Sequence, residues 1–162
     1  MKIDGRSYRT IWPAEDGWSV EIIDQTKLPH QFEVARLGSL DDAAHAIRAM
    51  LVRGAPLIGA TAAYGMALAM RSDCSDAGLD HAYELLLATR PTAVNLRWAL
   101  DDMRVRLQDQ PQDVRTGIAY ARAAEVCDED VAICSAIGDH GLALIQAAFD
   151  KKPGDAPVNV LT

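Results

Sequence analysis

Two arginines that each precede a predicted helix are the residues best suited to chemistry in this sequence. Arg53 is followed by Gly54 and Ala55, whose small side chains leave their backbone N–H groups open to a ligand. Pro56 suits the first position of a helix predicted over residues 57–71, where its missing N–H is not needed. The unpaired N–H groups and the positive end of the helix dipole favour an anion, and a phosphate group fits this arrangement.

The second arginine, Arg90, stands before Pro91 and Thr92. Proline disfavours the helical conformation for the residue before it, so Arg90 is expected in extended backbone. Thr92 is a good N-cap for a helix predicted over residues 93–108. Both arginines therefore precede a helix N-terminus, and two such sites together would suit one small phosphorylated ligand.

Residues 54–56 have a structural alternative, because glycine and arginine are common at helix C-termini for reasons unrelated to ligands. On that interpretation these residues only link two packed helices, and Arg53 is a solvated charge. The second arginine segment, which begins at Arg90, favours the ligand-binding interpretation over the structural one.

Both arginine segments, with two further motifs in register, resemble the methylthioribose-1-phosphate isomerase family. The four motifs are Arg53-Gly54-Ala55-Pro56 with Ile58-Gly59, Arg90-Pro91-Thr92-Ala93-Val94-Asn95-Leu96, Asp24-Gln25-Thr26-Lys27-Leu28-Pro29 and Ile137-Gly138-Asp139-His140-Gly141. Each motif alone is weak, whereas four in order along nearly the whole chain are specific. The wider superfamily includes ribose-1,5-bisphosphate isomerase and regulatory subunits of the eukaryotic translation-initiation nucleotide exchange factor.

The resemblance implies a sugar-phosphate aldose–ketose isomerase of L-methionine salvage, which converts S-methyl-5-thioribose 1-phosphate to S-methyl-5-thioribulose 1-phosphate. It implies that Arg53, Gly54, Ala55 and Arg90 bind the sugar phosphate, and that the catalytic Cys and Asp lie beyond Thr162. The chain is then expected to supply part of the phosphate site, to contain no catalytic residue and to be inactive alone.

Two alternatives stay open within the same superfamily. One is a ribose-1,5-bisphosphate or 5-deoxyribose-1-phosphate isomerase, and the other is a non-catalytic regulatory subunit. His-Cys-Asn encoded directly after Thr162 would favour an enzyme. The resemblance also makes a homodimer the expected assembly, and neither the residues nor the resemblance calls for a metal or a cofactor.

The composition is that of an ordinary soluble domain, with 49% hydrophobic and 24% charged residues. A net charge of −7 argues against nucleic acid or an anionic membrane as a partner. Three cysteines without Cys-x-x-Cys spacing indicate neither a disulfide framework nor a zinc site, which fits the reducing cytoplasm. Cys127 and Cys134 are expected to be small core residues.

The elements that must position the arginines predict a mainly α fold with a small N-terminal three-stranded antiparallel sheet. The resemblance implies that the chain is the N-terminal part of a larger α/β protein with a Rossmann-like C-terminal domain. The predicted parts are an antiparallel sheet subdomain over residues 1–38, a helical bundle over 39–150, and a linker with the first strand of the Rossmann-like domain over 151–162.

Alternating apolar and polar residues predict strands over 8–13, 18–24 and 31–37, the first two joined by a turn at Asp16-Gly17. Helical spacing predicts further helices over 77–88, 113–137 and 142–149, with a bend at Gly138 between the last two. Trp12 and Trp18 are expected to stack over the sheet, unless one of them walls the thioether of the substrate.

Ser39 is expected to cap a helix that runs into Val52 and Arg53 with Met50 on its buried face. Trp98 is expected on the buried face of the helix after Thr92.

Overall fold

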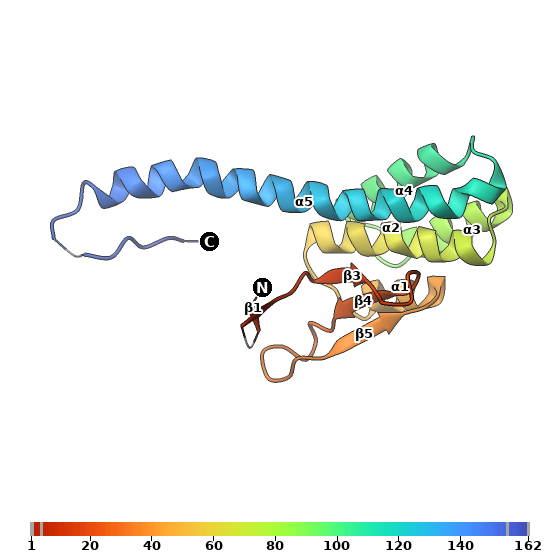
Figure 1. The fold of residues 1–162 in the computed structure, drawn as a ribbon, viewed down its shortest axis with the longest axis horizontal. Coiled ribbons are helices and arrows are strands. Elements are labelled where there is room, and N and C mark those ends of the chain that lie inside the picture. The colour runs from red at the N-terminus through yellow and green to blue at the C-terminus, as the bar shows by residue number, and fades with distance from the viewer. Residues whose placement is uncertain (1, 4, 155, 162) are drawn as a thin grey trace. The chain divides into compact units, whose positions relative to one another are not determined.

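The computed structural model describes residues 2–3, 5–154 and 156–161 of the chain. The described chain divides into two compact units, residues 1–127 and 128–162 (Figure 1). The boundary falls inside the last helix, α5 (Gln112–Phe149), whose first part belongs to the first unit. All the residues that are predicted to bind phosphate lie in the first unit.

Among the residues of the first unit that the structure describes, five short strands form two antiparallel sheets. They are β1 (Lys2–Ile3), β2 (Arg6–Ser7), β3 (Ile11–Pro13), β4 (Val20–Ile23) and β5 (Val34–Leu37). β1 pairs with β2, and the other three form a sheet in the order β3-β4-β5. The three-stranded antiparallel sheet confirms the prediction, although each strand is shorter than its apolar pattern suggested. The β1–β2 hairpin was not predicted.

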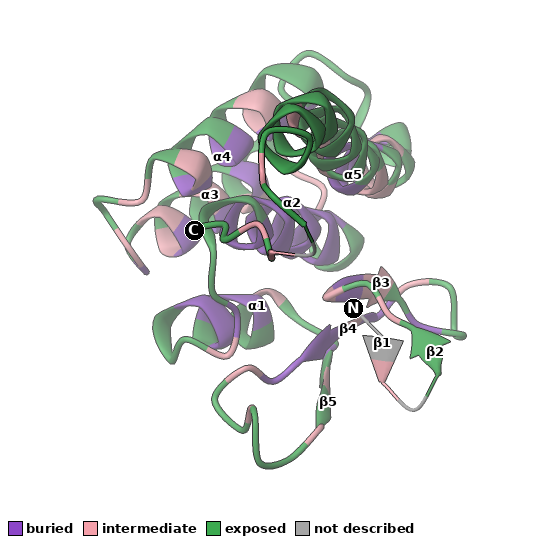
Figure 2. Cartoon of the chain, turned by 90° about the vertical axis from the view of Figure 1, so that its left-hand side faces the viewer, coloured by how far each residue is buried: buried purple, intermediate pink, exposed green. Residues whose placement is uncertain are grey.

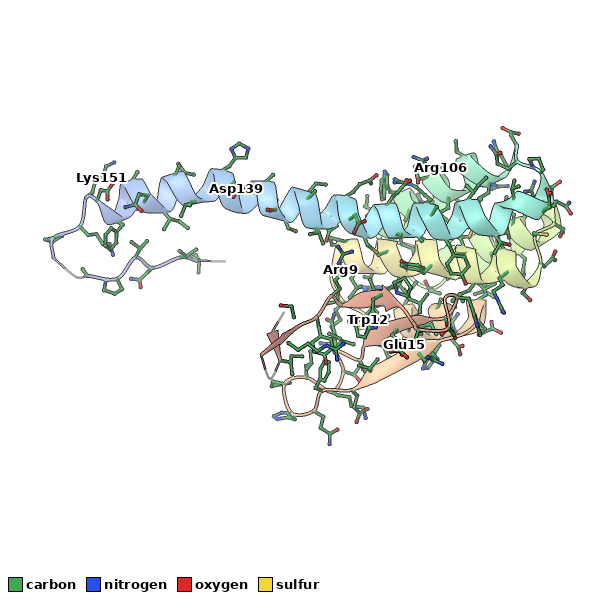
Figure 3. All side chains as sticks on the ribbon, viewed as in Figure 1. Arg9, Trp12, Glu15, Arg106, Asp139 and Lys151 are labelled. Carbon is green, nitrogen blue, oxygen red and sulfur yellow. The ribbon has the colours of Figure 1, made fainter. Side chains whose placement is uncertain are left out.

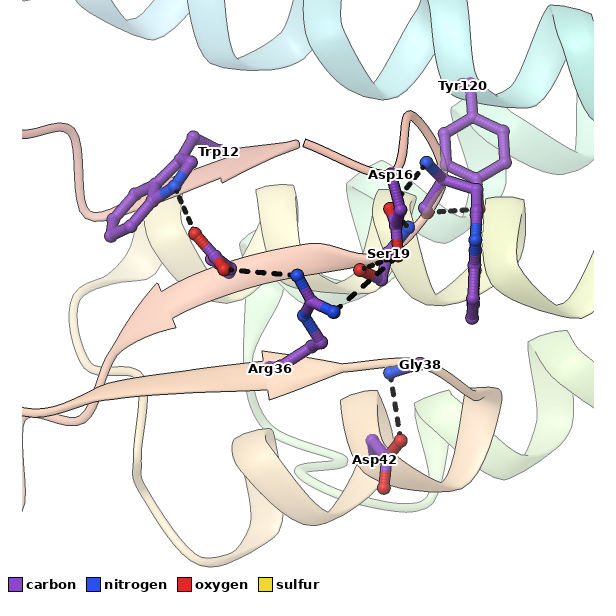
Figure 4. Close-up of polar contacts among 9 residues, drawn as sticks. Trp12, Asp16, Ser19, Arg36, Gly38, Asp42 and Tyr120 are labelled. Carbon is purple, nitrogen blue, oxygen red and sulfur yellow. Dashed lines mark hydrogen bonds and ion pairs between the residues drawn. The ribbon is translucent and has the colours of Figure 1, made fainter. Parts of the chain in front are cut away.

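A polar network on the outer face of the larger sheet holds its register (Figure 4). Asp16 accepts hydrogen bonds from the backbone N–H groups of Trp18 (3.0 Å) and Ser19 (2.8 Å), which closes the β3–β4 turn and holds the pKa of the Asp16 carboxyl below its usual value. Trp12 donates its indole N–H to Glu21 on the neighbouring strand at 2.7 Å. The opposite face supplies the buried residues Ile11, Val20, Ile22 and Leu37.

The helices are α1 (Leu40–Arg48), α2 (Ala55–Ser72), α3 (Asp76–Leu87), α4 (Val94–Leu107) and α5. α2 packs against α1, α3 and α4, and every residue of α2 from Leu57 to Met70 is buried (Figure 2). Gly65 allows the close packing, because a Cβ there would lie 3.0 Å from Ala43 on α1 and 3.1 Å from Leu86 on α3. The helix predicted over residues 57–71 is confirmed.

α1 begins as predicted and ends earlier than predicted. The Ser39 hydroxyl accepts the N–H of Asp42, so Ser39 is the N-cap. The helix stops at Arg48 rather than running into Val52, and Met50 adopts a left-handed conformation with φ of 61°. That conformation turns the chain so that the N–H groups of residues 51 and 52 both reach the carbonyl of Ala46. Met50 therefore points to solvent, and its predicted place on a buried face is wrong.

α4 shows two further corrections. Its N-cap is Ala93 rather than Thr92, because the N–H of Ala93 donates to the carbonyl of Arg90 and closes a turn that delays the helix. Trp98 is 50% exposed. Leu96 and Leu100 set the buried face of α4, and a residue two positions from each points to the other side of a helix.

α5 is one continuous helix. It runs through Gly138, where a bend was predicted, and through the predicted break between residues 137 and 142. Cys127 is buried as expected, whereas Cys134 is exposed and is not a core residue. By length and composition alone, α5 is apolar enough to cross a membrane, with an 18-residue window of mean hydropathy 1.4. Residues 156–161 form no strand in this structure, and Thr162 lies outside the described residues. The strand of a further domain stays a prediction.

Candidate anion-binding site

The N-terminal ends of α2 and α4 differ from those of α1 and α3 in having no side-chain cap. Ser39 and Ser75 cap α1 and α3 by accepting backbone N–H groups, whereas Gly54 and Ala93, the N-caps of α2 and α4, offer no such acceptor. Gly54 has a φ of 92°, which a residue with a side chain rarely adopts. The first N–H groups of α2 and α4 therefore remain available to an external acceptor.

These two uncapped ends line one hollow of about 400 Å³. Its lining residues are Gly54, Ala55, Ile58, Arg90, Ala93, Val94 and Asn95. The structure thus brings together three of the four residues that the sequence analysis selected, Gly54, Ala55 and Arg90. They come from two segments more than thirty residues apart, and the packing of α2 against α4 unites them.

Arg53 is not among the residues that line the hollow. It is exposed, and its Nε donates to the carbonyl of Met50 at 3.5 Å, the upper limit for such a bond. It immediately precedes Gly54, which does line the hollow.

Asn95 and Ile58 line the hollow although sequence reasoning did not select them. Both lie inside the quoted motifs, so the signal was their place in those motifs rather than their residue type. The half-buried amide of Asn95 has no hydrogen-bond partner among the described residues. It adds a neutral donor and acceptor beside the guanidinium of Arg90.

The electrostatics of the hollow favour an anion. No carboxylate lines it, and Arg90 has neither an ion pair nor a side-chain hydrogen bond among the described residues. In contrast, the buried Arg122 pairs with Asp102 at 2.6 Å. An arginine with no partner, set between two uncapped helix ends, can hold a doubly charged phosphate. The lining side chains include no base or nucleophile, so the chemistry of this hollow is binding and positioning.

The motif over residues 24–29 supports the loop that carries Arg53. The carboxylate of Asp24 is largely buried and accepts the N–H (2.9 Å) and the hydroxyl (2.6 Å) of Thr26, which forms a tight turn. The N–H of Gln25 then donates to the carbonyl of Leu51 at 2.9 Å. The motif thus contacts the loop through backbone atoms, at a residue two positions before Arg53.

Two other hollows in the first unit have linings of mixed charge, with Arg71 in one and Arg6 and Arg9 in the other beside carboxylates. One lies among α1, α2 and α3 and includes Asp41 and Asp73. The other lies beside the sheets and includes Trp12 with Glu15 and Glu21. Trp12 and Glu15 are labelled in Figure 3. Carboxylates line both, and neither Trp12 nor Trp18 lines the hollow of Arg90. Among the described residues, no three His, Cys, Asp or Glu side chains gather as a metal site.

The fold and the hollow define a mainly helical domain in which two uncapped helix N-termini line one hollow. The sequence profile of the Initiation factor 2 subunit family matches residues 51–152, and the chain belongs to that family. The matched residues include both uncapped helix ends.

Named relatives within the family include isomerases. The chain is 60% identical, over its whole length, to a methylthioribose-1-phosphate isomerase of Methylorubrum extorquens, and it covers 44% of that relative. It thus spans less than half the length of such curated relatives.

Two solved structures share the fold. The 5-methylthioribose 1-phosphate isomerase of Pyrococcus horikoshii is 38% identical with a TM-score of 0.69, and the match covers 76% of this chain and 36% of that one. Subunit delta of the translation initiation factor eIF-2B from A. fulgidus is 34% identical with a TM-score of 0.70, over 77% of this chain and 38% of that one. The fold therefore occurs both in an isomerase and in a translation factor subunit.

Proposed function

We propose that this chain supplies the phosphate-binding part of an aldose–ketose isomerase that converts S-methyl-5-thioribose 1-phosphate to S-methyl-5-thioribulose 1-phosphate in L-methionine salvage. The observation that carries the proposal is the shared hollow of Gly54, Ala55 and Arg90 at two uncapped helix N-termini. The names of relatives at 60% identity support the substrate.

In this proposal the phosphate sits between the two helix ends. Arg90 donates from its guanidinium, Gly54 and Ala55 donate from the backbone, and Arg53 adds its charge from the rim. An aldose phosphorylated on its anomeric oxygen does not open its ring as a free sugar does. A fixed phosphate therefore matters, because it holds the first two carbons of the sugar in place for ring opening and hydrogen transfer.

The groups that carry out the hydrogen transfer are proposed to lie outside this chain. No side chain that lines the hollow is a base or nucleophile, and the chain covers 44% of the isomerase relative. The remaining proposals are a Rossmann-like domain that begins within residues 151–162, a homodimeric assembly and a cytoplasmic location.

Calorimetry and an isomerase assay together test the proposal. Titration of this chain with inorganic phosphate and with methylthioribose 1-phosphate is expected to show binding, with the sugar phosphate binding more tightly. A polypeptide of the relatives' full length is expected to isomerise methylthioribose 1-phosphate faster than its 5-deoxy analogue or ribose 1,5-bisphosphate. Absence of isomerase activity on all three sugars would refute the enzymatic proposal.

A second candidate function is a non-catalytic regulatory subunit, because the eIF-2B subunit delta of A. fulgidus shares the fold at a TM-score of 0.70. Phosphate binding by the hollow is expected under both functions. Isomerase activity of the full-length polypeptide separates them, and the preferred sugar among the three distinguishes the isomerases from one another.

A further inference from the structure

The hollow at the starts of α2 and α4 contains one polar side chain to which phosphate binding assigns no role. Asn95 is the second residue of α4, and it is half-buried. Its side-chain amide has no hydrogen-bond partner among the described residues. Apart from Arg90, the other residues of the lining are glycine or have aliphatic side chains. The hydrogen-bonding groups of this amide are therefore available to a ligand in the hollow.

The packing of α4 against α2 sets the position of this amide. A Cβ atom on Gly59 of α2 would lie 3.1 Å from the backbone oxygen of Asn95 and 3.6 Å from the Cβ atom of Ala99. Asn95 and Ala99 are four residues apart, so they share the face of α4 that packs on α2. Side chains on a helix lean toward its N-terminus. The side chain of Asn95 therefore extends from this face toward the hollow at the helix start.

The amide of Asn95 is also the only side-chain hydrogen-bond acceptor among the residues that line the hollow. The guanidinium of Arg90 and the first N–H groups of both helices only donate hydrogen bonds. These donors suit a phosphate dianion, which only accepts, but the Oδ1 atom of Asn95 finds no donor on such an anion. A hydroxyl group supplies one, because it donates as well as accepts. The hollow thus suits a phosphate ester that carries a hydroxyl close to its phosphate.

In a sugar 1-phosphate the hydroxyl closest to the phosphate is the one on C2. The phosphate and this hydroxyl stand on adjacent carbons, so one hollow of about 400 Å³, a usual size for a small-molecule site, has room for both. The ring oxygen is also bonded to C1, but it has no hydrogen to donate. The 2-hydroxyl is therefore the group of the ligand that matches the Asn95 acceptor.

We propose that the side chain of Asn95 binds the 2-hydroxyl of the sugar 1-phosphate and makes the site specific for ribosyl over 2-deoxyribosyl phosphates. The inference rests on the proposed function, because it needs the phosphate between the two helix ends. In the aldose, Oδ1 accepts the hydrogen of the 2-hydroxyl. The same sugar oxygen is the ketone oxygen of the product and only accepts, and the N–H groups of the amide then donate to it.

A phosphate ester without a 2-hydroxyl is expected to bind less tightly. Such a ligand covers the amide and separates it from water, and it offers no hydrogen bond in return. A site built around a hydroxyl rejects the analogue that lacks it for this reason. Because Asn95 is neutral and only half-buried, we expect a preference of about five- to tenfold, the effect of a single hydrogen bond.

Calorimetry with three phosphates tests the contact. This chain is titrated with ribose 1-phosphate, 2-deoxyribose 1-phosphate and inorganic phosphate, of which the first two differ only at C2. The unchanged chain is expected to bind the ribose ester about five- to tenfold more tightly than the deoxyribose ester. In Asn95→Ala the two esters are expected to bind equally. Affinity for the ribose ester falls, while affinity for the other two probes changes less than about twofold.

A merely structural role of Asn95 gives a different result. If the amide only holds α4 on α2, Asn95→Ala weakens the binding of all three phosphates together, and the preference for the ribose ester survives. That outcome overturns the proposal. Alanine is the best helix former, so circular dichroism is expected to show full helicity in the variant.

Thr92→Ala is the matched control. Thr92 is exposed, precedes the same helix and does not line the hollow. The control is expected to leave all three affinities and the preference for the ribose ester unchanged. A lost preference in Thr92→Ala would show that any change at this end of α4 has the effect attributed to the amide, and it would overturn the assignment to Asn95.

Asn95→Asp tests whether the side chain lies close to the phosphate. The variant keeps the size of the side chain and adds a negative charge, which also suits the first turn of a helix. Like-charge repulsion is expected to weaken the binding of inorganic phosphate and of both esters about tenfold, and added salt is expected to reduce this loss. Unchanged binding of inorganic phosphate by this variant would place the side chain away from the anion and overturn the proposal.

A polypeptide of the relatives' full length supplies a kinetic test. 2-Deoxyribose 1-phosphate has no hydroxyl on C2 to become a ketone, so it is expected to act as an unreactive competitive inhibitor. Asn95→Ala is expected to lower kcat/KM for methylthioribose 1-phosphate at least about fivefold and to leave the inhibition constant of the deoxy ester unchanged. An unchanged kcat/KM, or equal losses in both constants, would contradict the proposed contact.

The inference and the proposed function fail separately. If the unchanged chain binds inorganic phosphate and shows no preference between the two esters, the phosphate site stands and the contact to the 2-hydroxyl is refuted. If neither this chain nor the full-length polypeptide binds any of the three probes, the phosphate site itself is refuted, and the inference with it.

Discussion

The backbone oxygen of Asn95 lies 3.1 Å from the position that a Cβ atom on Gly59 would occupy. Gly59 is in the second turn of α2, and Asn95 is the second residue of α4. The missing side chain therefore sets how closely the two helix starts approach. Because Gly54 and Arg90 line the hollow from these same two helix starts, the spacing of the proposed phosphate site depends on a glycine that does not line it.

Gly59→Ala is expected to widen the proposed site. The added methyl must push the α4 backbone away by a few tenths of an ångström, and we expect the affinity of the chain for phosphate to fall by roughly three- to tenfold in calorimetry. The free energy of unfolding should change little, since the strain opposes a gain in helix propensity of about 1 kcal/mol. Gly117→Ala is the control, because it brings the propensity gain without a neighbour within 4 Å. Equal behaviour of the two variants would show that α2 and α4 tolerate the methyl.

Arg90→Gln is expected to weaken binding without unfolding the chain. The side chain has no partner among the described residues, so its loss leaves no buried group unpaired. In a full-length polypeptide, kcat/KM is expected to fall by a factor on the order of 10 to 1,000, as for the loss of one strong charged contact. Arg97→Gln, on the exposed side of the same helix, serves as the control. Equal kinetics of the Arg90 variant and the unchanged protein would remove Arg90 from the site.

Features of this fold that depend on neighbouring residues could be predicted from local sequence patterns. The predictions were wrong where contacts between distant residues decide the conformation of the chain. Ser39 caps α1 as its sequence predicts, because the hydroxyl and the N–H that it accepts are three residues apart. Met50 has helical spacing yet faces solvent, because the chain must turn to return the N–H groups of residues 51 and 52 to the carbonyl of Ala46. No local sequence pattern predicts that turn.

The residues of the candidate site likewise divide into those that the sequence could predict and those that it could not. Gly54, Ala55 and Arg90 were predictable, because small residues and a cation beside a helix N-terminus have a chemical meaning wherever they occur. Asn95 was not selected, since its place across the hollow from Gly54 and Ala55 depends on the packing of α4 against α2, which the sequence does not display. The exclusion of Arg53 from the lining depends likewise on the end of α1.

Arg115→Ala is expected to destabilise the first unit more than any surface arginine change. Arg115 is 3% exposed and donates to the carbonyls of Cys74 (3.0 Å), Gln108 (2.8 Å) and Gln110 (3.0 Å). Its removal leaves these carbonyls without that donor and opens a gap beneath α5. We expect the free energy of unfolding in urea to fall by about 3 kcal/mol or more. Arg106→Ala, whose pair with Asp102 is largely exposed, should cost less than about 1 kcal/mol.

Tyr120→Phe is expected to change how stability depends on pH at the alkaline end. The Tyr120 hydroxyl donates to the carbonyl of Trp18 at 2.6 Å and joins α5 to the β3–β4 turn. Burial raises the pKa of this phenol above its ordinary value of 10.0. The folded state therefore holds the proton more tightly than the unfolded chain. The stability from this group is complete below pH 10 and is lost as the pH rises from that value through the pKa of the folded protein.

The variant should lose about 1 kcal/mol of unfolding free energy at neutral pH, because the carbonyl of Trp18 loses its donor. It should also lose less further stability than the unchanged protein when the pH is raised above 10. Denaturant unfolding at several pH values measures both effects, and ultraviolet titration counts the phenols that ionise late.

Tyr83→Phe is the informative comparison. The Tyr83 hydroxyl donates to Asp101 at 2.6 Å at an exposed position, and that hydrogen bond raises the pKa of Tyr83. We expect the Tyr83 variant to lose one late-ionising phenol with a smaller loss of stability at neutral pH, because water replaces the partner of Asp101. Equal losses of unfolding free energy in the two variants at neutral pH would contradict this account, in which burial of the Trp18 carbonyl makes the Tyr120 hydrogen bond the more stabilising one.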